Sequence, residues 1–250
     1  MKNIIINALK GRNLIVIIRK LIKRLEVNNN VKALKWAKSN STISTDEFCK
    51  SIDENLFQSI KQEIINIETK AQSKLKNLGI NLGGGGNYIL LYFLIRKFRP
   101  CVVVETGVAA GWTSLAILEA LNKNENGNLY SSDFPYFRLE NPENYVGFLV
   151  EPSALKERWN LDIRGDEIAL PNICSLLGDK KINLFHYDSD KSHSGRKLAL
   201  KTLEKNLAAD CIIIFDDIQD NLHFRDLVND GSVNYKILEF QGKYVGIIGV

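Results

Sequence analysis

Carboxylate side chains directly follow three predicted strands of this chain, a spacing that can build a binding site. Short segments of this kind are typical of parallel strands in a covered sheet. Because ligands bind at the carboxyl ends of such strands, we expect the acids to meet at one edge of one sheet. The acids, with the segment that each one follows, are Asp133 (129–132), Asp188 (182–187) and the pair Asp216-Asp217 (211–215).

A glycine-containing turn follows a fourth such segment, the valine run 102–104, and leads into a predicted helix. Gly107 and Gly111 let the backbone turn sharply and come close to a ligand, directly after Glu105. The start of the helix would aim unpaired N–H groups at the same place, where a carboxylate or another polar group could bind. The turn alone is equally compatible with a purely structural connection. Asp133 favours a binding site, because an acid at the end of the second strand can bind ribose hydroxyls.

The elements that position these residues alternate between strands and helices. This alternation predicts an α/β fold, a doubly wound Rossmann-like sheet of about seven strands with an antiparallel C-terminal hairpin and an N-terminal helical extension. We expect residues 1–80 to form the extension and residues 81–250 the sheet domain. The expected strands are 102–104, 129–132, 160–164, 182–187, 211–215, 234–240 and 243–250. The expected helices include one that begins near residue 44, a longer one after it that contains residues 56–75 and ends near 77–79, and the segments 88–98, 170–177, 195–208 and 222–229.

Composition indicates a globular protein with a cytoplasmic location. The chain has 250 residues, of which 45% are hydrophobic, enough for one α/β domain with a sizeable core. Its four cysteines show no CxxC spacing, so we expect small buried thiols in a reducing compartment rather than disulfides or a zinc site. The net charge of +4 is uneven: residues 1–40 carry ten Lys or Arg and one acid, a balance of +9, which leaves −5 for the rest.

Residues 14–25 have the pattern of a basic amphipathic helix. Leucine and isoleucine recur there at helical spacing, with Lys and Arg on the other side. Three alternatives stay open for residues 1–25: docking on the chain's own domain, contact with a partner subunit in a homo-oligomer, or peripheral contact with an anionic membrane. No apolar run is long enough for a membrane span, and we expect no signal peptide because no small-residue cleavage site follows a long apolar segment. No motif indicates nucleic-acid binding. Residues 29–30 and 39–45 are expected to be connectors.

Two further stretches each leave two readings open. The glycine run 83–86 precedes an apolar helix, so it is either a linker or a backbone that approaches a ligand closely. The aromatic-rich stretch 134–159 either covers the sheet or closes over a substrate.

In these motifs the chain resembles the class I S-adenosylmethionine-dependent methyltransferases. It is most similar to their metal-dependent O-methyltransferases, which include catechol O-methyltransferase and the sugar methyltransferases of macrolide biosynthesis. The resemblance covers residues 82–250 and is carried by GGGGN followed by ETGVAAGWTS. It implies that S-adenosylmethionine is the cofactor, with the methionine part near Gly84, Gly107 and Thr113, the ribose near Asp133 and the adenine near Asp166. Glu105 and Gly111 complete the implied cofactor-binding turn.

The same resemblance implies a metal site and a catalytic base. The family's metal ligands fall on Asp188, Asp216 and Asp217, an oxygen-only set that suits Mg²⁺ or a similar divalent cation. The alternative is that these acids only cap helices or face solvent. Catechol O-methyltransferase has its lysine base where this chain has Lys191, whereas other members carry a histidine there. His193 is therefore a second candidate base, and Asp188 completes the implied catalytic set.

These expectations define a function. We expect a Mg²⁺-assisted O-methyltransferase that acts on a hydroxyl of a small acceptor, most closely a sugar or glycan precursor, because DSDKSHSG and FDD resemble the sugar-modifying branch. The alternatives are a non-catalytic cofactor-binding domain or a hydroxylase-like relative of the same fold. A nicotinamide-dependent oxidoreductase would require GxGxxG after the first strand, and the turn at Gly107 does not supply it.

Overall fold

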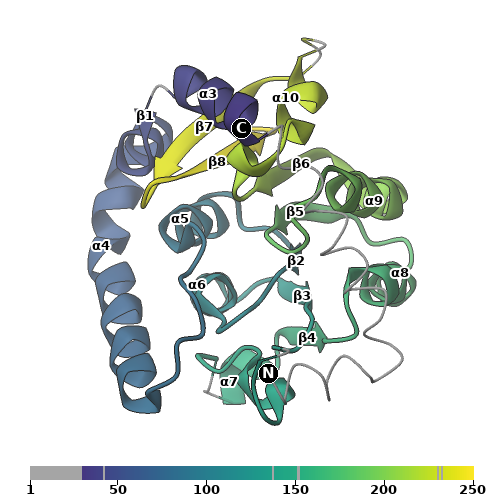
Figure 1. Ribbon diagram of the computed structural model, residues 1–250. Coiled ribbons are helices and arrows are strands. Elements are labelled where there is room, and N and C mark those ends of the chain that lie inside the picture. The colour runs from purple at the N-terminus through teal and green to yellow at the C-terminus, as the bar shows by residue number, and fades with distance from the viewer. Residues whose placement is uncertain (1–29, 42, 137, 151–152, 230, 232) are drawn as a thin grey trace.

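A single eight-stranded sheet organises the molecule. The computed structural model describes residues 30–250 except 42, 137, 151–152, 230 and 232. The strand order is β1-β7-β8-β6-β5-β2-β3-β4, and Figure 1 views the sheet between two layers of helices. The strands are β1 (Ile43–Ser44), β2 (Val102–Thr106), β3 (Asn128–Ser132), β4 (Trp159–Asp162), β5 (Ile182–Tyr187), β6 (Leu207–Phe215), β7 (Tyr235–Phe240) and β8 (Lys243–Ile248).

All neighbouring strands are parallel except at β8, which runs antiparallel to both β6 and β7. The chain order reverses direction between β2 and β5: β3 and β4 follow on one side of β2, and β6 lies beyond β5 on the other. Ligands of doubly wound sheets bind at such a switch point, outside the carboxyl ends of the strands. The predicted doubly wound sheet with a C-terminal hairpin is therefore confirmed.

Helices cover both faces of the sheet. In Figure 1, α5 and α6 lie against one face with α4 outside them, whereas α8 and α9 cover the other face. The α-helices are α3 (Asn30–Asn40), α4 (Thr45–Leu78), α5 (Tyr88–Phe98), α6 (Trp112–Asn124), α7 (Ser153–Lys156), α8 (Asp166–Leu177), α9 (His193–Leu203) and α10 (His223–Val228). Short 3-10 turns are η3 (Pro142–Tyr145), η4 (Glu204–Asn206) and η5 (Ile218–Asp220).

The long helix α4 joins the two consecutive helices expected here, and it begins and ends at the predicted caps. Ser44 Oγ accepts the Glu47 N–H (3.3 Å) and Glu47 Oε2 accepts the Ser44 N–H (2.8 Å), a complete capping box. Gly79 closes the helix in the left-handed conformation (φ 67°). The helix is kinked at Asp53, where φ is −160° and the carboxylate accepts the Leu56 N–H (2.9 Å) as a second cap.

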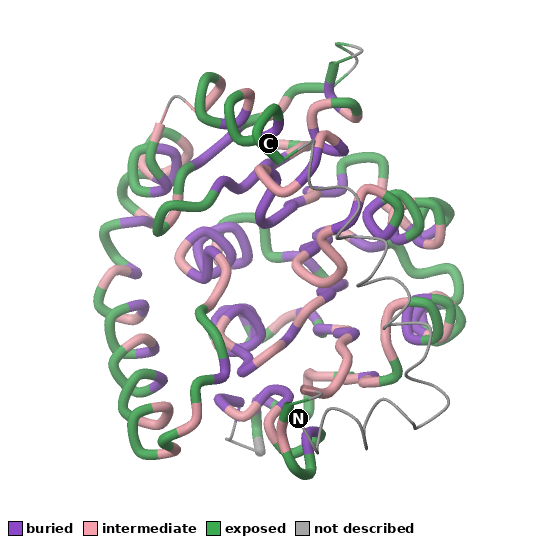
Figure 2. Tube along the Cα trace, in the orientation of Figure 1, coloured by how far each residue is buried: buried purple, intermediate pink, exposed green. Residues whose placement is uncertain are grey.

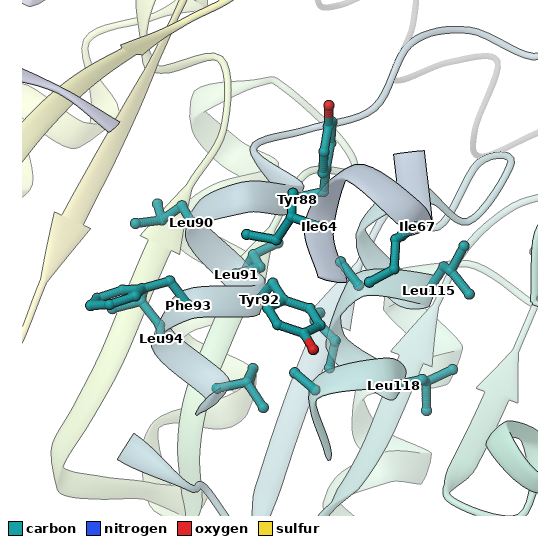
Figure 3. Packing of buried hydrophobic residues seen from close by; sticks show 14 of the residues in the cluster. Ile64, Ile67, Tyr88, Leu90, Leu91, Tyr92, Phe93, Leu94, Leu115 and Leu118 are labelled. Atoms are coloured by element: carbon teal, nitrogen blue, oxygen red, sulfur yellow. The ribbon is translucent and has the colours of Figure 1, made fainter. Parts of the chain in front are cut away.

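The main core lies between α4, α5, α6 and the sheet. Helix α5 is apolar on nearly all sides because it is enclosed by the sheet, α4 and α6, so Leu90, Leu91 and Phe93 are completely buried. Figure 3 shows these side chains with Ile64 and Ile67 of α4, and Figure 2 shows that α4 is buried only along its inner side. Residues 45–78 therefore share one core with the sheet domain.

The structure adds one strand to the expected seven. The eighth, β1, is a two-residue strand from the N-terminal region that pairs with β7. Residues 30 and 39–40, expected to lie in connectors, form the two ends of α3, and residues 43–44 of the second expected connector form β1.

Some predicted boundaries were also wrong. Strand β6 begins four residues earlier than expected, at Leu207, so α9 ends at Leu203 instead of Ala208. Cys101 is exposed rather than buried, although all four cysteines are free as expected.

The predicted amphipathic helix 14–25 lies outside the described residues. Within the described part of the chain, none of the helices is both long enough and apolar enough to cross a membrane.

Candidate active site

The glycine turn after β2 has the conformation that the sequence predicts. Gly107 has a φ of 83°, its N–H donates to the Ser132 carbonyl (2.9 Å), and a Cβ there would overlap the carbonyl oxygen of Asp188. Gly111 has a φ of 95° and precedes α6, whose first turn is capped by no side chain. The turn thus joins the tips of β2, β3 and β5, and it leaves the N–H groups of the α6 start available to a ligand.

A buried chain of charges runs across the sheet beneath this turn. Glu105 is fully buried and accepts hydrogen bonds from Ser114 Oγ (2.5 Å) and Ser131 Oγ (2.9 Å). Its other oxygen lies 3.7 Å from Nδ1 of His186, whose Nε2 lies 3.5 Å from Oδ2 of Asp216. Burial by itself lowers the pKa of His186, but the two carboxylates outweigh it and raise this pKa to about 10. The two carboxylates therefore favour the charged imidazolium form of His186, whose single positive charge offsets part of theirs.

The acids at the tips of β5 and β6 form a cluster with lysines. Lys191 Nζ lies 2.7 Å from Oδ1 of Asp188 and is also paired with Oδ2 of Asp217. Lys243, at the start of β8, approaches Oδ1 of Asp217 to 3.3 Å. Gln219 Nε2 donates to the same Asp217 oxygen (3.0 Å). This acid–lysine cluster, residues 188, 191, 217 and 243, is the charged part of the site.

Backbone contacts fix the cluster in place. Arg196 is completely buried and its Nη2 donates to the carbonyl oxygens of Asp216 and Asp217 (2.8 Å each). Asn221 Nδ2 donates to the Lys191 carbonyl (2.7 Å). Asp217 itself adopts the left-handed conformation (φ 51°), which turns the chain sharply after β6. The loops after β5 and β6 are therefore held together as one unit.

The glycine run 83–86 reaches this unit at its last residue. A Cβ at Gly86 would overlap Oδ2 of Asp216 and lie 3.2 Å from Thr113 Cγ2, whereas a Cβ at Gly84 would meet nothing within 4 Å. Asn87, the next residue, caps α5 and donates to Thr45 Oγ1 of α4 (2.7 Å). The backbone at Gly86 thus packs on Asp216, which favours a structured segment over a linker.

Asp133 lies at the tip of β3, as predicted. Its carboxylate accepts the N–H groups of Ala109 and Phe134 (2.6 Å each). Removal from water is the largest influence and raises the pKa of Asp133 to about 7, with smaller contributions from Asp166 and Glu105. Asp166 is held by the hydroxyls of two serines, one on β3 and one after β5. Each oxygen of Asp133 keeps a lone pair for a further donor such as a hydroxyl group.

The structure separates the two candidate bases. Lys191 lies in the acid–lysine cluster, whereas His193 faces α10, with its Nε2 3.7 Å from Asp226 Oδ2 and its ring 5.1 Å from that of His223. Thr113 is buried in the first turn of α6. Every predicted acid except Glu105 thus lies at a strand tip or helix start on the same edge of the sheet, and Glu105 lies buried beneath it.

Sequence reasoning missed three residues of this site, His186, Arg196 and Lys243, and it did not distinguish Gly86 from the other glycines of the run 83–86. A histidine inside the apolar segment INLFHY was a visible signal, because a buried polar group requires a partner. The other three come from distant positions, and no local pattern distinguishes them.

The donor set does not fit a divalent cation in this arrangement. Within the described part of the chain, no group of three or more His, Cys, Asp or Glu side chains could hold a metal ion. Asp188, Asp216 and Asp217 do lie at neighbouring tips, but the Lys191 ammonium bridges two of them. Magnesium requires oxygen ligands at roughly 2.0–2.1 Å with free lone pairs.

Comparisons with known proteins agree with the fold. A family model described as a methyltransferase domain matches residues 104–218. A methyltransferase from Geobacter sulfurreducens has a TM-score of 0.54 and 16% identity, over 74% of this chain and 88% of its own. An O-methyltransferase from Bacillus cereus, in complex with SAH, has a TM-score of 0.57 and 13% identity, over 82% of this chain and 100% of its own.

A third similar structure is TomG from Streptomyces achromogenes, an O-methyltransferase involved in tomaymycin synthesis, in complex with SAM. It has a TM-score of 0.56 and 13% identity, over 74% of this chain and 88% of its own. A sequence search of curated proteins gives no match. The chain therefore has the Rossmann-like fold of these methyltransferases, and its residues 104–218 are similar to a methyltransferase domain.

Proposed function

We propose that the protein is an S-adenosylmethionine-dependent O-methyltransferase that methylates a hydroxyl group of a small acceptor. One observation carries the proposal: the uncapped start of α6 and the acid–lysine cluster lie on the same edge of the sheet, joined by the contact of Gly107 with Asp188. A methyl donor and an acceptor require two such neighbouring subsites. Two of the similar structures are O-methyltransferases, which supports oxygen as the methylated atom.

The donor side offers groups that match the polar ends of the cofactor. The N–H groups at the start of α6 suit a carboxylate, and Asp133 suits two ribose hydroxyls. Bound there, S-adenosylmethionine supplies a methyl group on a positively charged sulfur. Glu105 has only internal contacts, so its role is to hold the ends of β2, β3 and β5 around the turn rather than to bind the ligand.

The acceptor side would be the acid–lysine cluster. Burial is the main influence that raises the pKa of Asp188, and the Asp216 carboxylate adds to it, so Asp188 is a stronger base than an ordinary aspartate. Asp188 takes the proton of the acceptor hydroxyl as the new carbon–oxygen bond forms and the methyl–sulfur bond breaks. The Lys191 ammonium, 2.7 Å from Asp188, stabilises the negative charge that develops on the oxygen. Correct positioning supplies the rest of the rate.

A sugar or glycan precursor is the acceptor class that we propose. The side chains around Asp217 are polar: Gln219 of η5 donates to it, and Lys243 at the start of β8 lies 3.3 Å from it. Neighbouring donors and acceptors of this kind match the adjacent hydroxyl groups of a sugar better than a flat aromatic ring. The resemblance of the loop after β5 to sugar-modifying enzymes points the same way.

The test is a mass-spectrometric screen of purified protein with S-adenosylmethionine and a panel of sugars, nucleotide sugars and catechols. A mass gain of one CH₂ unit on a sugar, absent with Asp188→Asn, is the expected result. The matched control is Asp210→Asn, which changes an exposed acid in the first half of β6, before its carboxyl end. Calorimetric binding of the cofactor with no methylation of any acceptor would replace this proposal with a non-catalytic or hydroxylase-like function.

A further inference from the structure

The aspartates of the acid–lysine cluster already have a cation between them. Lys191 Nζ contacts both Asp188 Oδ1 and Asp217 Oδ2, and its side chain is only 22% exposed. We propose that Lys191 takes the place of the divalent cation that this arrangement of acids would otherwise bind, and that methyl transfer by this protein requires no metal ion. The catalytic half of this inference rests on the proposed function, whereas the binding half does not.

Asp217 has no oxygen left for a metal. Its Oδ1 is approached by Lys243 Nζ (3.3 Å) and accepts from Gln219 Nε2 (3.0 Å), while its Oδ2 pairs with Lys191 and lies 3.4 Å from Lys243 Nζ. A metal ligand would have to give up these partners, and each lost contact to a charged group costs free energy. Asp217 is also 5% exposed, so water could replace the lost partners only poorly.

The carboxylate of Asp216 also has partners of its own. Its Oδ2 lies against Gly86 and 3.5 Å from the His186 imidazole. Rotating this carboxylate toward a metal beside Asp188 would break a buried ion pair. Of the buried oxygens of these three aspartates, Asp216 Oδ1 and Asp188 Oδ1 have no hydrogen-bond partner among the described atoms, and Asp188 Oδ1 already lies 2.7 Å from the Lys191 ammonium.

The lysine is held where a bound cation would be needed. The Lys191 carbonyl accepts from Asn221 Nδ2 (2.7 Å), and the neighbouring Asp190 carbonyl accepts from Tyr187 Oη (2.6 Å). An ammonium group has three N–H donors, so pairing with two aspartates leaves one for an acceptor oxygen. Lys191 can therefore both neutralise the aspartates and orient a hydroxyl group, two tasks that a metal would otherwise perform.

Metal binding tests the inference without any acceptor. The full-length protein is treated with EDTA, desalted and titrated with Mn²⁺, and binding is followed by electron paramagnetic resonance and calorimetry. We expect no saturable Mn²⁺ site in the wild type. Lys191→Ala, which leaves the carboxylates unpaired, should bind Mn²⁺ at least about tenfold more tightly than the weak, non-saturable binding of the wild type. A second change, Asp188→Asn, should remove the gain, and Lys201→Ala, an exposed lysine of α9, should behave as the wild type.

A saturable Mn²⁺ site in the wild type that Asp217→Asn removes would overturn the inference, and this measurement does not depend on the folding of Lys191→Ala. Once an acceptor is identified, unchanged turnover in EDTA is expected, and a loss that Mg²⁺ restores would equally overturn it. Failure to find any methylated acceptor would count against the proposed function only. The Mn²⁺ titration still distinguishes aspartates neutralised by Lys191 from aspartates that bind a divalent cation.

Discussion

Two alanine substitutions in one glycine run distinguish a close backbone approach from a flexible linker. In Gly86→Ala the new Cβ would overlap Oδ2 of Asp216 and lie 3.3 Å from its Cγ, so the carboxylate must rotate away. In Gly84→Ala the new Cβ meets nothing within 4 Å, and the residue is outside the left-handed region. The two glycines lie two positions apart, yet only the substitution at Gly86 is expected to disturb a neighbouring side chain.

The magnitude for Gly86→Ala follows from what Asp216 loses. Its ion pair with His186, 3.5 Å between Nε2 and Oδ2, is almost fully buried, and breaking such a pair costs roughly 3–5 kcal/mol. At about 2–4 °C per kcal/mol for a chain of this size, the lower bound corresponds to a fall of about 6–12 °C in Tm. Gly84→Ala should instead gain up to about 1 kcal/mol, because it reduces the freedom of the unfolded chain.

Thermal unfolding and cofactor calorimetry measure both variants. Since a shift of about 1 Å near the reacting atoms can cost about 100-fold in rate, we also expect Gly86→Ala to lose most of its methyl-transfer activity. Equal Tm values for the two variants would refute the packing of Gly86 on Asp216. Loss of cofactor binding in Gly84→Ala alone would instead support the position that the family resemblance assigns to Gly84.

Four further expectations concern pH and the N-terminal region. Because Asp133 has a pKa near 7 and binds ribose best as a carboxylate, calorimetry should show cofactor affinity rising between pH 6 and 8, and Asp133→Asn should abolish this slope. The pKa of His186 is raised in the folded protein, so the folded protein keeps a proton that the unfolded chain loses above pH 6.5. The free energy of unfolding, measured with denaturant, should therefore fall as the pH rises towards 10. In His186→Gln this pH dependence should be absent. Removal of residues 1–29 should abolish sedimentation with anionic vesicles; if the full chain does not sediment either, docking on its own domain or on a partner subunit remains. A chain starting at residue 81 should be insoluble, because it exposes the face of α5 that α4 covers; a soluble, folded product would establish the expected domain boundary.

Most helices and strands of the fold could be predicted from local sequence patterns. The capping box at Ser44 and Glu47 and the apolar run of α5 each depend on residues a few positions apart, so the sequence alone locates them. The C-terminal hairpin is equally local, with its turn at Gln241-Gly242. The strand β1 could not be foreseen, because two residues carry no periodicity and their partner in β7 lies almost 200 positions away.

The convergence of the acids was predictable because it also depends on local sequence. A parallel strand that ends in an acid places it at the carboxyl edge, whatever the rest of the chain does, and Asp133, Asp188 and Asp217 all lie there. Which of them would be buried, and with which partner, depends on contacts between loops. The pKa of Asp133 near 7 comes from burial, which no spacing encodes.

The chemistry of the site depends on the residues that the spacing could not reveal. Three strand-end aspartates fit two opposite arrangements, a metal bound among free carboxylates or carboxylates neutralised by the protein's own cations. Lys243 lies 26 residues after Asp217 in the chain yet comes within 3.3 Å of it, because β8 returns antiparallel to β6. His186 is placed beside Asp216 by the register of β5 against β6. Since the antiparallel return and the strand register supply these charges, it is the topology of the sheet, more than the aspartates themselves, that sets the balance between the two arrangements.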